Sequence, residues 1–463
     1  MGGELRRKAV HVAMGGFALL LRWLTPWQAA ACALAALLFN LLLLHRLTRR
    51  SLLRDAEVGR GYSPGIALYP VAVLALVLVF RDRLELAAAA WALLAFGDGM
   101  ATVAGVTLGG PRLPWNRGKS WAGFLAFVLW GTAAAAFLVR WVQGGVLGGG
   151  FRGHVGASFL PTDGSLGQPG LLIAGCLAAA LLAALAESMR TGIDDNILVP
   201  LVGGSALYAA TLVDPARLMA SVAEGPWVAA AGVNAALAVL AYAARGVTVS
   251  GAVVGWILGT LLFGLGGPAG FAMLLVFFVL GTAFTKLGYA RKASLGIAQE
   301  KGGRRAAKHA LANSGAGVLA AFLMAATGAP SAFALALVAA FATALSDTTG
   351  SEIGQAYGRT PFLITTFRRV PPGTDGAVSV EGTLAGIAAS ALVAAAAWGL
   401  GLVDGIGAGI VVAAAFVGTT LESYLGATLE RKQEVDNEVV NFMNTAAGAA
   451  AALLMMGMVS GVR

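Results

Sequence analysis

Long continuous runs of apolar residues, separated by short polar segments, dominate this chain. A membrane-spanning helix needs on the order of 20 mostly apolar residues. About fifteen such stretches occur, at residues 9–25, 27–45, 64–80, 84–104, 120–142, 169–187, 197–213, 227–245, 247–266, 268–288, 310–328, 331–348, 383–403, 404–425 and 439–460. The runs are continuous rather than alternating, so they predict helices and not the strands of a barrel. The pattern predicts an all-α, polytopic integral membrane protein.

Composition and charge agree with a membrane location. Apolar residues make up 58% of the chain and charged residues 12%, against roughly 45–50% and about 25% in soluble domains. We attribute the net charge of +9 to orientation and anionic lipid headgroups, so we expect membrane lipid, and no nucleic acid, as a partner. Basic clusters at Arg6–Lys8, Arg291–Lys292 and Arg368–Arg369 fall on one side if the helices alternate. We therefore expect the N-terminus and the catalytic loops to be cytoplasmic.

Four sequence elements recur in the same order in the two halves. Each half has a His after a basic cluster, an Asp at a helix end, a small-residue segment that opens a helix, and a Glu followed by Asp-Asn. The first-half copies are marked by His11, Asp98, Gly118 and Glu187, and the second-half copies by His309, Asp347, Ser379 and Glu422. We interpret them as two homologous tandem domains, at 1–220 and 246–463, with an extra helical hairpin in the first. The alternative is chance similarity in a chain rich in glycine and alanine.

Polar groups at the ends of membrane helices are costly to keep in apolar surroundings and point to function. Phosphoryl transfer needs carboxylate and amide oxygens for Mg²⁺, together with a cation and backbone N–H groups for phosphate oxygens. In the first half the candidates are Asp98, Asp195 and Asn196 for metal, Asn116, Lys119 and Ser120 for nucleotide phosphate, Asp98, Lys119 and Glu187 for catalysis, and His11 for substrate. The simpler reading makes the acids solvated helix ends and His11 an interfacial residue.

The second half offers a parallel set with more basic residues, which suits an acceptor that is already phosphorylated. Its candidates are Asp347, Glu352 and Glu381 for catalysis, Asp347, Asp436 and Asn437 for metal, Lys308, Arg368, Arg369, Thr374 and Asp375 for phosphate, and His309, Glu422 and Asn441 for substrate. The run from Arg291 to Lys308 is also explained as a signal for membrane orientation.

Several familiar sites are excluded by their motifs. Gly118-Lys119-Ser120 is not a Walker loop, because Leu113 stands where the motif requires glycine and the segment does not follow a buried strand. No HExxH or cysteine cluster indicates zinc, and no GxSxG indicates a serine nucleophile.

Two families resemble the halves of the chain. The segments FGDGMATVAG, LPWNRGKSWAG and GIDDNILVP of the first half are similar to the phytol, farnesol and dolichol kinase family. Residues 345–386 of the second half, with LESYLGATLE and VDNEVVNFMNT after them, resemble the phytyl-phosphate kinase family. The resemblance implies functional roles for Asp98, Lys119, Asp195 and Asn196, and for Asp347, Glu352, Thr374, Asp375, Glu381, Asp436 and Asn437. It also implies a nucleoside triphosphate donor, with CTP expected.

The two resemblances together predict a fusion of two kinases. We expect a long-chain isoprenoid alcohol to be phosphorylated to its monophosphate and then to its diphosphate, with Mg²⁺ as cofactor. A membrane cytidylyltransferase is one alternative, and it would release diphosphate rather than a nucleoside diphosphate. A duplicated transporter is another, but its polar residues would lie near mid-membrane.

Overall fold

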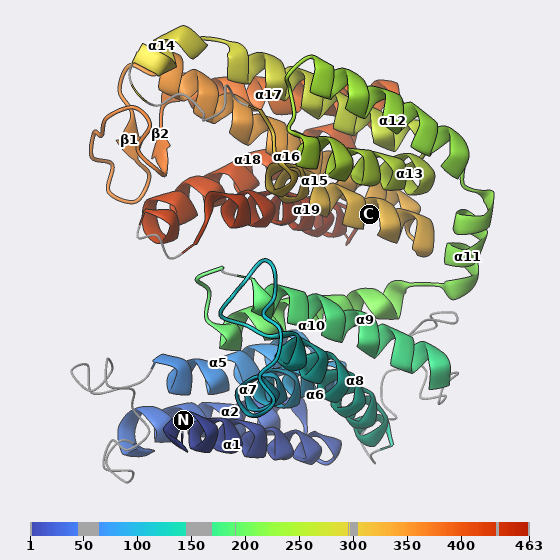
Figure 1. Cartoon of the computed structure of the whole chain (residues 1–463), viewed down its shortest axis with the longest axis vertical. Helices are drawn as coiled ribbons and strands as arrows, with labels where there is room; N and C mark the ends of the chain where they lie inside the picture. Colours follow the sequence, from blue (N-terminus) through green and yellow to red (C-terminus); the bar gives the residue numbers. More distant parts are fainter. Residues whose placement is uncertain are drawn as a thin grey trace. The chain divides into compact units, whose positions relative to one another are not determined.

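A computed structural model describes residues 2–44, 64–144, 169–189, 191–294, 296, 304–431 and 435–461. The chain divides into two compact units, Met1–Pro215 and Ala216–Arg463. The boundary lies at the start of α11, Pro215–Glu224, so the segment that we left between the two predicted domains packs with the second unit. In Figure 1 the first unit is coloured blue to green and the second green to red.

The first unit is built around one buried helix. This central helix runs without a break through α6, Leu84–Ala92, the π-helical turn η3, Leu93–Asp98, and α7, Gly99–Thr107, and residues 86–95 are all buried. The surrounding elements are α1, Gly2–Met14, η1, Gly15–Arg22, α2, Pro26–Phe39, η2, Asn40–Leu44, α5, Pro64–Val79, α8, Trp121–Gln143, α9, Pro169–Ser188, and α10, Asp195–Leu212. Residues on α5, α8, α9 and α10 complete the apolar core of this unit.

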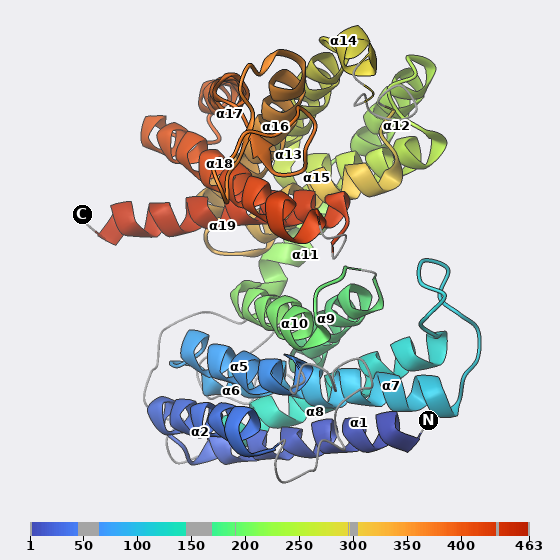
Figure 2. The same cartoon turned by 90° about the vertical axis from the view of Figure 1, so that its left-hand side faces the viewer.

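The second unit also surrounds a buried central helix, α16, Pro330–Tyr357, of which residues 333–346 are all buried. Around it lie α13, Val249–Lys286, α15, Ala307–Ala326, α17, Val380–Gly399, α18, Gly405–Leu425, and α19, Asn437–Gly461 (Figure 2). The remaining helices are α12, Trp227–Ala243, α14, Tyr289–Ser294, and the π-helical turn η5, Gly426–Glu430. A small antiparallel hairpin, β1, Phe362–Leu363, and β2, Ala377–Val378, pairs Phe362 with Val378 between α16 and α17.

Every apolar stretch that we predicted is helical over most of its described length, but the count of fifteen spans is not confirmed. In the part of the chain that the structure describes, ten helices are long and apolar enough to cross a membrane, or eleven if the bent pair α11 and α12 is one span. Two predicted stretches join in α13, where Gly267 has φ 68° and precedes Pro268 at a kink. The helix α5 has 16 residues, fewer than a usual span.

Candidate active sites

In the first unit, Asp98 occupies the end of the π-helical turn in the central helix. Such turns widen a helix by one residue and are frequent at functional sites. The turn also brings Gly97 against the ring of Phe127, where a Cβ atom would lie 2.8 Å from the ring. Only 2% of Asp98 is exposed. The local fold therefore holds a carboxylate inside the unit, where its charge needs compensation.

Two residues of α1 supply part of that compensation. Lys8 Nζ lies 2.6 Å from Asp98 Oδ2, and His11 Nε2 lies 3.4 Å from the same oxygen. His11 Nε2 also lies 2.9 Å from the carbonyl oxygen of Leu94. The Lys8 ammonium and the His11 ring both approach Oδ2, whereas Asp98 Oδ1 is buried with no hydrogen-bond partner. A buried carboxylate oxygen without a partner in the protein is rare, and Oδ1 is available to coordinate a cation.

Three carboxylates converge at this position. One oxygen each from Asp98, Glu187 and Asp195 lie within 4.8 Å of one another. They come from three different elements, because Glu187 is near the end of α9 and Asp195 is the first residue of α10. Mg²⁺ binds oxygen ligands and is usually held by a few carboxylates together with water and phosphate. The oxygens present, including the unpaired Oδ1 of Asp98, fit such an ion.

Lys119 lies at the edge of this cluster. Its Nζ donates to Glu187 Oε1 and lies 3.9 Å from Asp195 Oδ2. Burial alone would lower the pKa of Lys119, but the carboxylates of Glu187 and Asp195 outweigh it and raise the pKa. Burial raises the pKa of Asp195 to about 7, with Lys119 opposing the shift. Lys119 is therefore a fixed cation beside the three acids.

The other predicted residues of the first unit shape its loops. The side chain of Asn116 donates to the carbonyl of Ser188 at 2.9 Å and accepts from Gly118 N at 3.0 Å. Ser120 is the N-cap of α8 and accepts from Gly123 N at 3.2 Å. Asn196 donates to Asp194 Oδ1 through its backbone N and its Nδ2, while its Oδ1 is buried without a partner. Asn116 and Ser120 thus hold the loop that carries Lys119.

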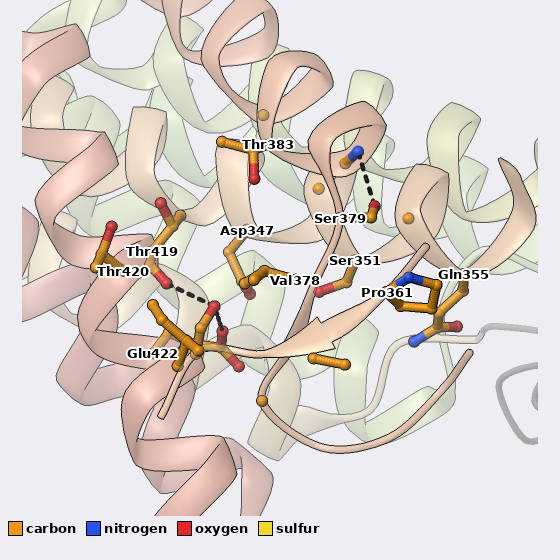
Figure 3. A pocket seen from close by; sticks show the side chains of 18 of the residues that line it. Asp347, Ser351, Gln355, Pro361, Val378, Ser379, Thr383, Thr419, Thr420 and Glu422 are labelled. Atoms are coloured by element: carbon orange, nitrogen blue, oxygen red, sulfur yellow. Dashed lines mark hydrogen bonds between the residues drawn. The ribbon is translucent and has the colours of Figure 1, made fainter. Parts of the chain in front are cut away.

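The second unit contains a cavity of about 390 Å³ between α16, α17, α18 and the hairpin segment. Asp347, Ser351 and Gln355 line it from α16, and Thr419, Thr420 and Glu422 line it from α18, as Figure 3 shows. The acids that line it are Asp347, Asp375, Glu422 and Glu430. Among the described residues, no Lys, Arg or His lines this cavity. The ionisable side chains of its described lining are therefore all acids.

Glycines bring α16 and α17 close together beneath this cavity. A Cβ atom on Gly382 would lie 2.5 Å from the carbonyl oxygen of Gly350, and one on Gly386 would lie 2.8 Å from that of Ser346. Ser379 is the N-cap of α17 and accepts from Gly382 N at 3.1 Å. Small residues permit this approach of two membrane helices.

The same local geometry occurs beside Asp98. A Cβ atom on Gly123 of α8 would lie 2.8 Å from the carbonyl oxygen of Ala101, three residues after Asp98, just as Gly350 follows Asp347 by three. The serine caps correspond as well. A Cβ atom on Gly105 would lie 3.4 Å from Ser120 Oγ, and one on Gly354 would lie 3.1 Å from Ser379 Oγ.

Only part of the predicted set in the second half meets at the cavity. Thr374 and Asn437 line it together with Asp347, Asp375 and Glu422, and Asn441 Nδ2 donates to Asn437 Oδ1 at 3.2 Å. Asp436, Arg368 and Arg369 are exposed and do not line it. The basic residues that we expected around its phosphate are therefore not part of its lining.

Four further predicted residues lie beside charged side chains that do not line the cavity. Glu352 is buried on another face of α16, where it accepts from Lys292 Nζ. Lys308 Nζ lies 2.7 Å from Glu438 Oε1, and His309 Nδ1 lies 3.5 Å from the same oxygen. Glu381 is 4.0 Å from the exposed Arg359.

Comparison with known proteins places the chain in a family. The profile of the family described as integral membrane protein DUF92 matches residues 232–449. An uncharacterized membrane protein of Synechocystis sp., sll0875, is 42% identical over 233 residues, which are 49% of this chain and 90% of that protein. The chain belongs to the DUF92 integral membrane family. All residues that line the cavity lie within the matched range.

Other relatives of this DUF92 protein carry more specific names. Protein VTE6, chloroplastic, of Arabidopsis thaliana is 38% identical over 217 residues, which are 45% of this chain and 65% of that protein. Probable phytol kinase 3, chloroplastic, of Glycine max is 29% identical over 211 residues, which are 43% of this chain and 60% of that protein. No solved structure matches the chain significantly. The family and the ten candidate spans make this an all-α integral membrane protein.

Sequence reasoning missed three residues that lie beside predicted ones in the DUF92 protein. Lys8 contacts Asp98, and its signal was its position one helical turn before His11. Glu430 lines the cavity, and its signal was its position about two turns after Glu422. Lys292 had no such signal, because it belongs to a basic run that orientation already explains.

Proposed function

We propose that this protein is a kinase for long-chain isoprenoid alcohols and their monophosphates, with one reaction site in each unit. The observation that carries this proposal is the buried cluster of Asp98, Glu187 and Asp195, with its unpaired Asp98 Oδ1 and its adjacent Lys119. The names of the phytol kinase relatives support this substrate class. The matching serine caps and glycine crossings beside Asp98 and Asp347 support a duplicated origin of the two sites.

In the first unit, we assign the alcohol kinase reaction to this cluster. The alcohol oxygen attacks the terminal phosphorus of a nucleoside triphosphate, the bond from that phosphorus to the bridging oxygen breaks, and a nucleoside diphosphate leaves. Asp98, Asp195 and Asn196 would hold Mg²⁺, which supplies charge neutralisation for the donor phosphates when bound. Lys119 binds the transferring phosphoryl group, and Glu187 accepts the proton of the hydroxyl group. CTP is the donor that we propose.

In the second unit, the acceptor is the monophosphate and the product is the diphosphate. A phosphate oxygen is ionised at neutral pH and attacks without a strong base, so positioning and charge neutralisation suffice. The cavity of about 390 Å³ lies between helices of an integral membrane protein, which suits an acceptor whose chain stays in the bilayer. Asp347, Glu422 and Asn437 offer oxygens for Mg²⁺. We propose that both sites and the N-terminus face the cytoplasm, where the nucleotide is available.

The test is product analysis with site variants. Purified protein is incubated with geranylgeraniol, Mg²⁺ and CTP labelled on its terminal phosphate. We expect Asp98→Asn to abolish all product from the alcohol but to convert supplied monophosphate to diphosphate. Asp347→Asn should instead let the monophosphate accumulate. Asp82→Asn is the matched control, because the side chain of Asp82 is 72% exposed and belongs to neither cluster.

Three results would contradict the proposal. Equal loss of both steps in each variant would exclude separate sites. Transfer of the nucleoside monophosphate to the lipid, with release of diphosphate, would identify a cytidylyltransferase. Wild-type protein that phosphorylates neither the alcohol nor the monophosphate would exclude kinase activity on these substrates.

A further inference from the structure

A second hollow in the second unit lies between α12, α13 and α15. It has a volume of about 110 Å³, and it shares no lining residue with the cavity that contains Asp347. Leucine, phenylalanine, alanine and glycine form most of its wall, and Arg305 is the residue in the wall with a permanent positive charge. The wall of this groove is therefore mostly apolar, with one permanent cation and the polar side chains of Asn234, His309 and Ser314.

Arg305 is held in a fixed position at the groove. Its backbone N donates to the carbonyl of Gly246 at 3.0 Å, and its carbonyl accepts from Thr248 N at 3.1 Å. Its guanidinium lies 4.8 Å from the ring centre of Phe277 and 5.8 Å from that of Phe278. Aromatic faces attract a cation, and they leave its N–H donors available to an acceptor outside the protein.

No anionic side chain in the described part of the chain is paired with Arg305. The carboxylate whose charge acts on it, that of Glu352, is bound to Lys292. Burial lowers the pKa of Arg305 to about 10, and the charge of Glu352 opposes this shift. The guanidinium is therefore still protonated at neutral pH, and it is partly exposed at the groove rather than sealed in the core. A cation at an apolar groove, with no carboxylate paired to it among the described residues, can bind an anionic ligand.

The groove has the layout of an amphiphile site. Arg305 and His309 lie around the start of α15, and they form the polar end of the groove. Leu258 and Phe271 lie in the interior of α13, and they form part of its apolar wall. The Nδ2 of Asn234 donates to the carbonyl oxygen of Ala230 within α12 at 2.9 Å, so this donor is already used. A ligand for this groove needs an anionic head for the guanidinium and an apolar chain for the helices.

We propose that this groove binds an isoprenoid monophosphate, with its phosphate on Arg305 and the first part of its chain between α12 and α13. The identity of the ligand rests on the proposed function, in which the monophosphate is the product of one step and the acceptor of the next. A phosphate monoester carries about −1.5 to −2 charges at neutral pH and matches the fork of a guanidinium. A volume of about 110 Å³ does not hold a whole long chain, so the rest of it extends into the bilayer.

The groove is a separate site from the cavity of the second unit. Residues of α12, α13 and α15 line the groove, whereas Asp347 and Ser351 of the central helix α16 line the cavity. The proposed ligand can therefore occupy the groove without occupying the cavity.

Direct binding to the full chain tests this inference, without nucleotide, so that no turnover is needed. The probe is radiolabelled geranylgeranyl monophosphate, and the protein is solubilised in detergent. Gly255→Leu fills the groove, because a Cβ atom at Gly255 meets nothing within 4 Å. Gly232→Leu is its matched control, since Gly232 also has open space around its Cβ position but does not line the groove. Arg305→Met removes the charge and replaces the guanidinium side chain with an unbranched apolar one.

We expect Gly255→Leu and Arg305→Met each to weaken binding at least about tenfold, and Gly232→Leu to change it less than about twofold. Geranylgeraniol should compete weakly and without dependence on Arg305. Unchanged affinity in Gly255→Leu, with Gly232→Leu also unchanged, would overturn the site. Equal competition by phosphatidic acid would make the occupant a bilayer phospholipid, and equal competition by inorganic phosphate would remove the role of the chain. If the wild type binds the probe at the groove but phosphorylates no isoprenoid, the proposed function fails and the site remains.

Discussion

The buried ion pair of Lys292 and Glu352 gives the sharpest prediction about stability. The side chains are 2% and 4% exposed, and Lys292 Nζ also donates to the carbonyl of Thr285 at 3.0 Å. Glu352→Gln keeps the volume of the side chain but leaves the ammonium group of Lys292 buried without a carboxylate. Removal of one partner from a buried pair costs about 3–5 kcal/mol. We therefore expect Glu352 to stabilise the second unit, although the sequence predicted a catalytic role.

The measurement is thermal unfolding of the purified protein in detergent, followed by tryptophan fluorescence. A loss of about 3–5 kcal/mol lowers the midpoint by about 6–20 °C, because 1 kcal/mol corresponds to about 2–4 °C for a unit of this size. Glu381→Gln is the matched control. Its carboxylate is 34% exposed and lies 4.0 Å from an Arg359 side chain that is 90% exposed, so the pair contributes about 0–1 kcal/mol.

A double variant separates the ion pair from packing. Lys292→Met combined with Glu352→Gln removes both charges, so the midpoint should recover most of the loss caused by Glu352→Gln alone. The reasoning is refuted if Glu352→Gln unfolds within about 2 °C of the wild type. A variant that keeps its midpoint but loses diphosphate formation would instead show that Glu352 acts on substrate.

Three further predictions concern the reaction sites and the helix crossing. Lys119→Met should lower the rate of monophosphate formation by about 10²–10³. Thr25→Ala removes the N-cap of α2 in the same unit, so it should lower stability by about 1 kcal/mol and leave the rate nearly unchanged; equal rates in the two variants would argue against a catalytic Lys119. The rate of diphosphate formation should depend on Mg²⁺ concentration with a higher reaction order than the rate of monophosphate formation. The reason is that the cavity lining has four carboxyl groups and no basic side chain among the described residues. The same reaction order in initial-rate titrations of both steps would contradict this. Gly382→Ala should destabilise the second unit, because its Cβ would lie 2.5 Å from the carbonyl oxygen of Gly350. Gly409→Ala should instead stabilise α18 by up to about 1 kcal/mol, because its Cβ would meet nothing within 4 Å. Unfolding midpoints that move in the same direction in the two variants would refute the close crossing.

The sequence by itself determined the class of protein and the main chemical positions. Continuous apolar runs produce membrane helices because a bilayer offers no water to the backbone. A carboxylate such as Asp98 or Asp347 within such a run is expensive, so its position already indicated a site. The order of the recurring elements also assigned Glu187 and Asp195 to the same site as Asp98, and Glu422 to the same site as Asp347, and these residues do lie together. These inferences depend only on local composition and order.

Tertiary structure decided which polar residues meet. In a membrane helix the side toward lipid and the side toward the protein are both apolar, so the pattern does not fix how each helix is rotated. Glu352 and Asp347 are five residues apart on one helix, yet the rotation of α16 gives one to Lys292 and the other to the cavity. Packing likewise brought Lys8 of α1 to Asp98, 90 residues away, and kept Arg368 and Arg369 out of the cavity lining. Contacts between helices depend on side-chain volume and close approach across the whole unit, which no local pattern contains.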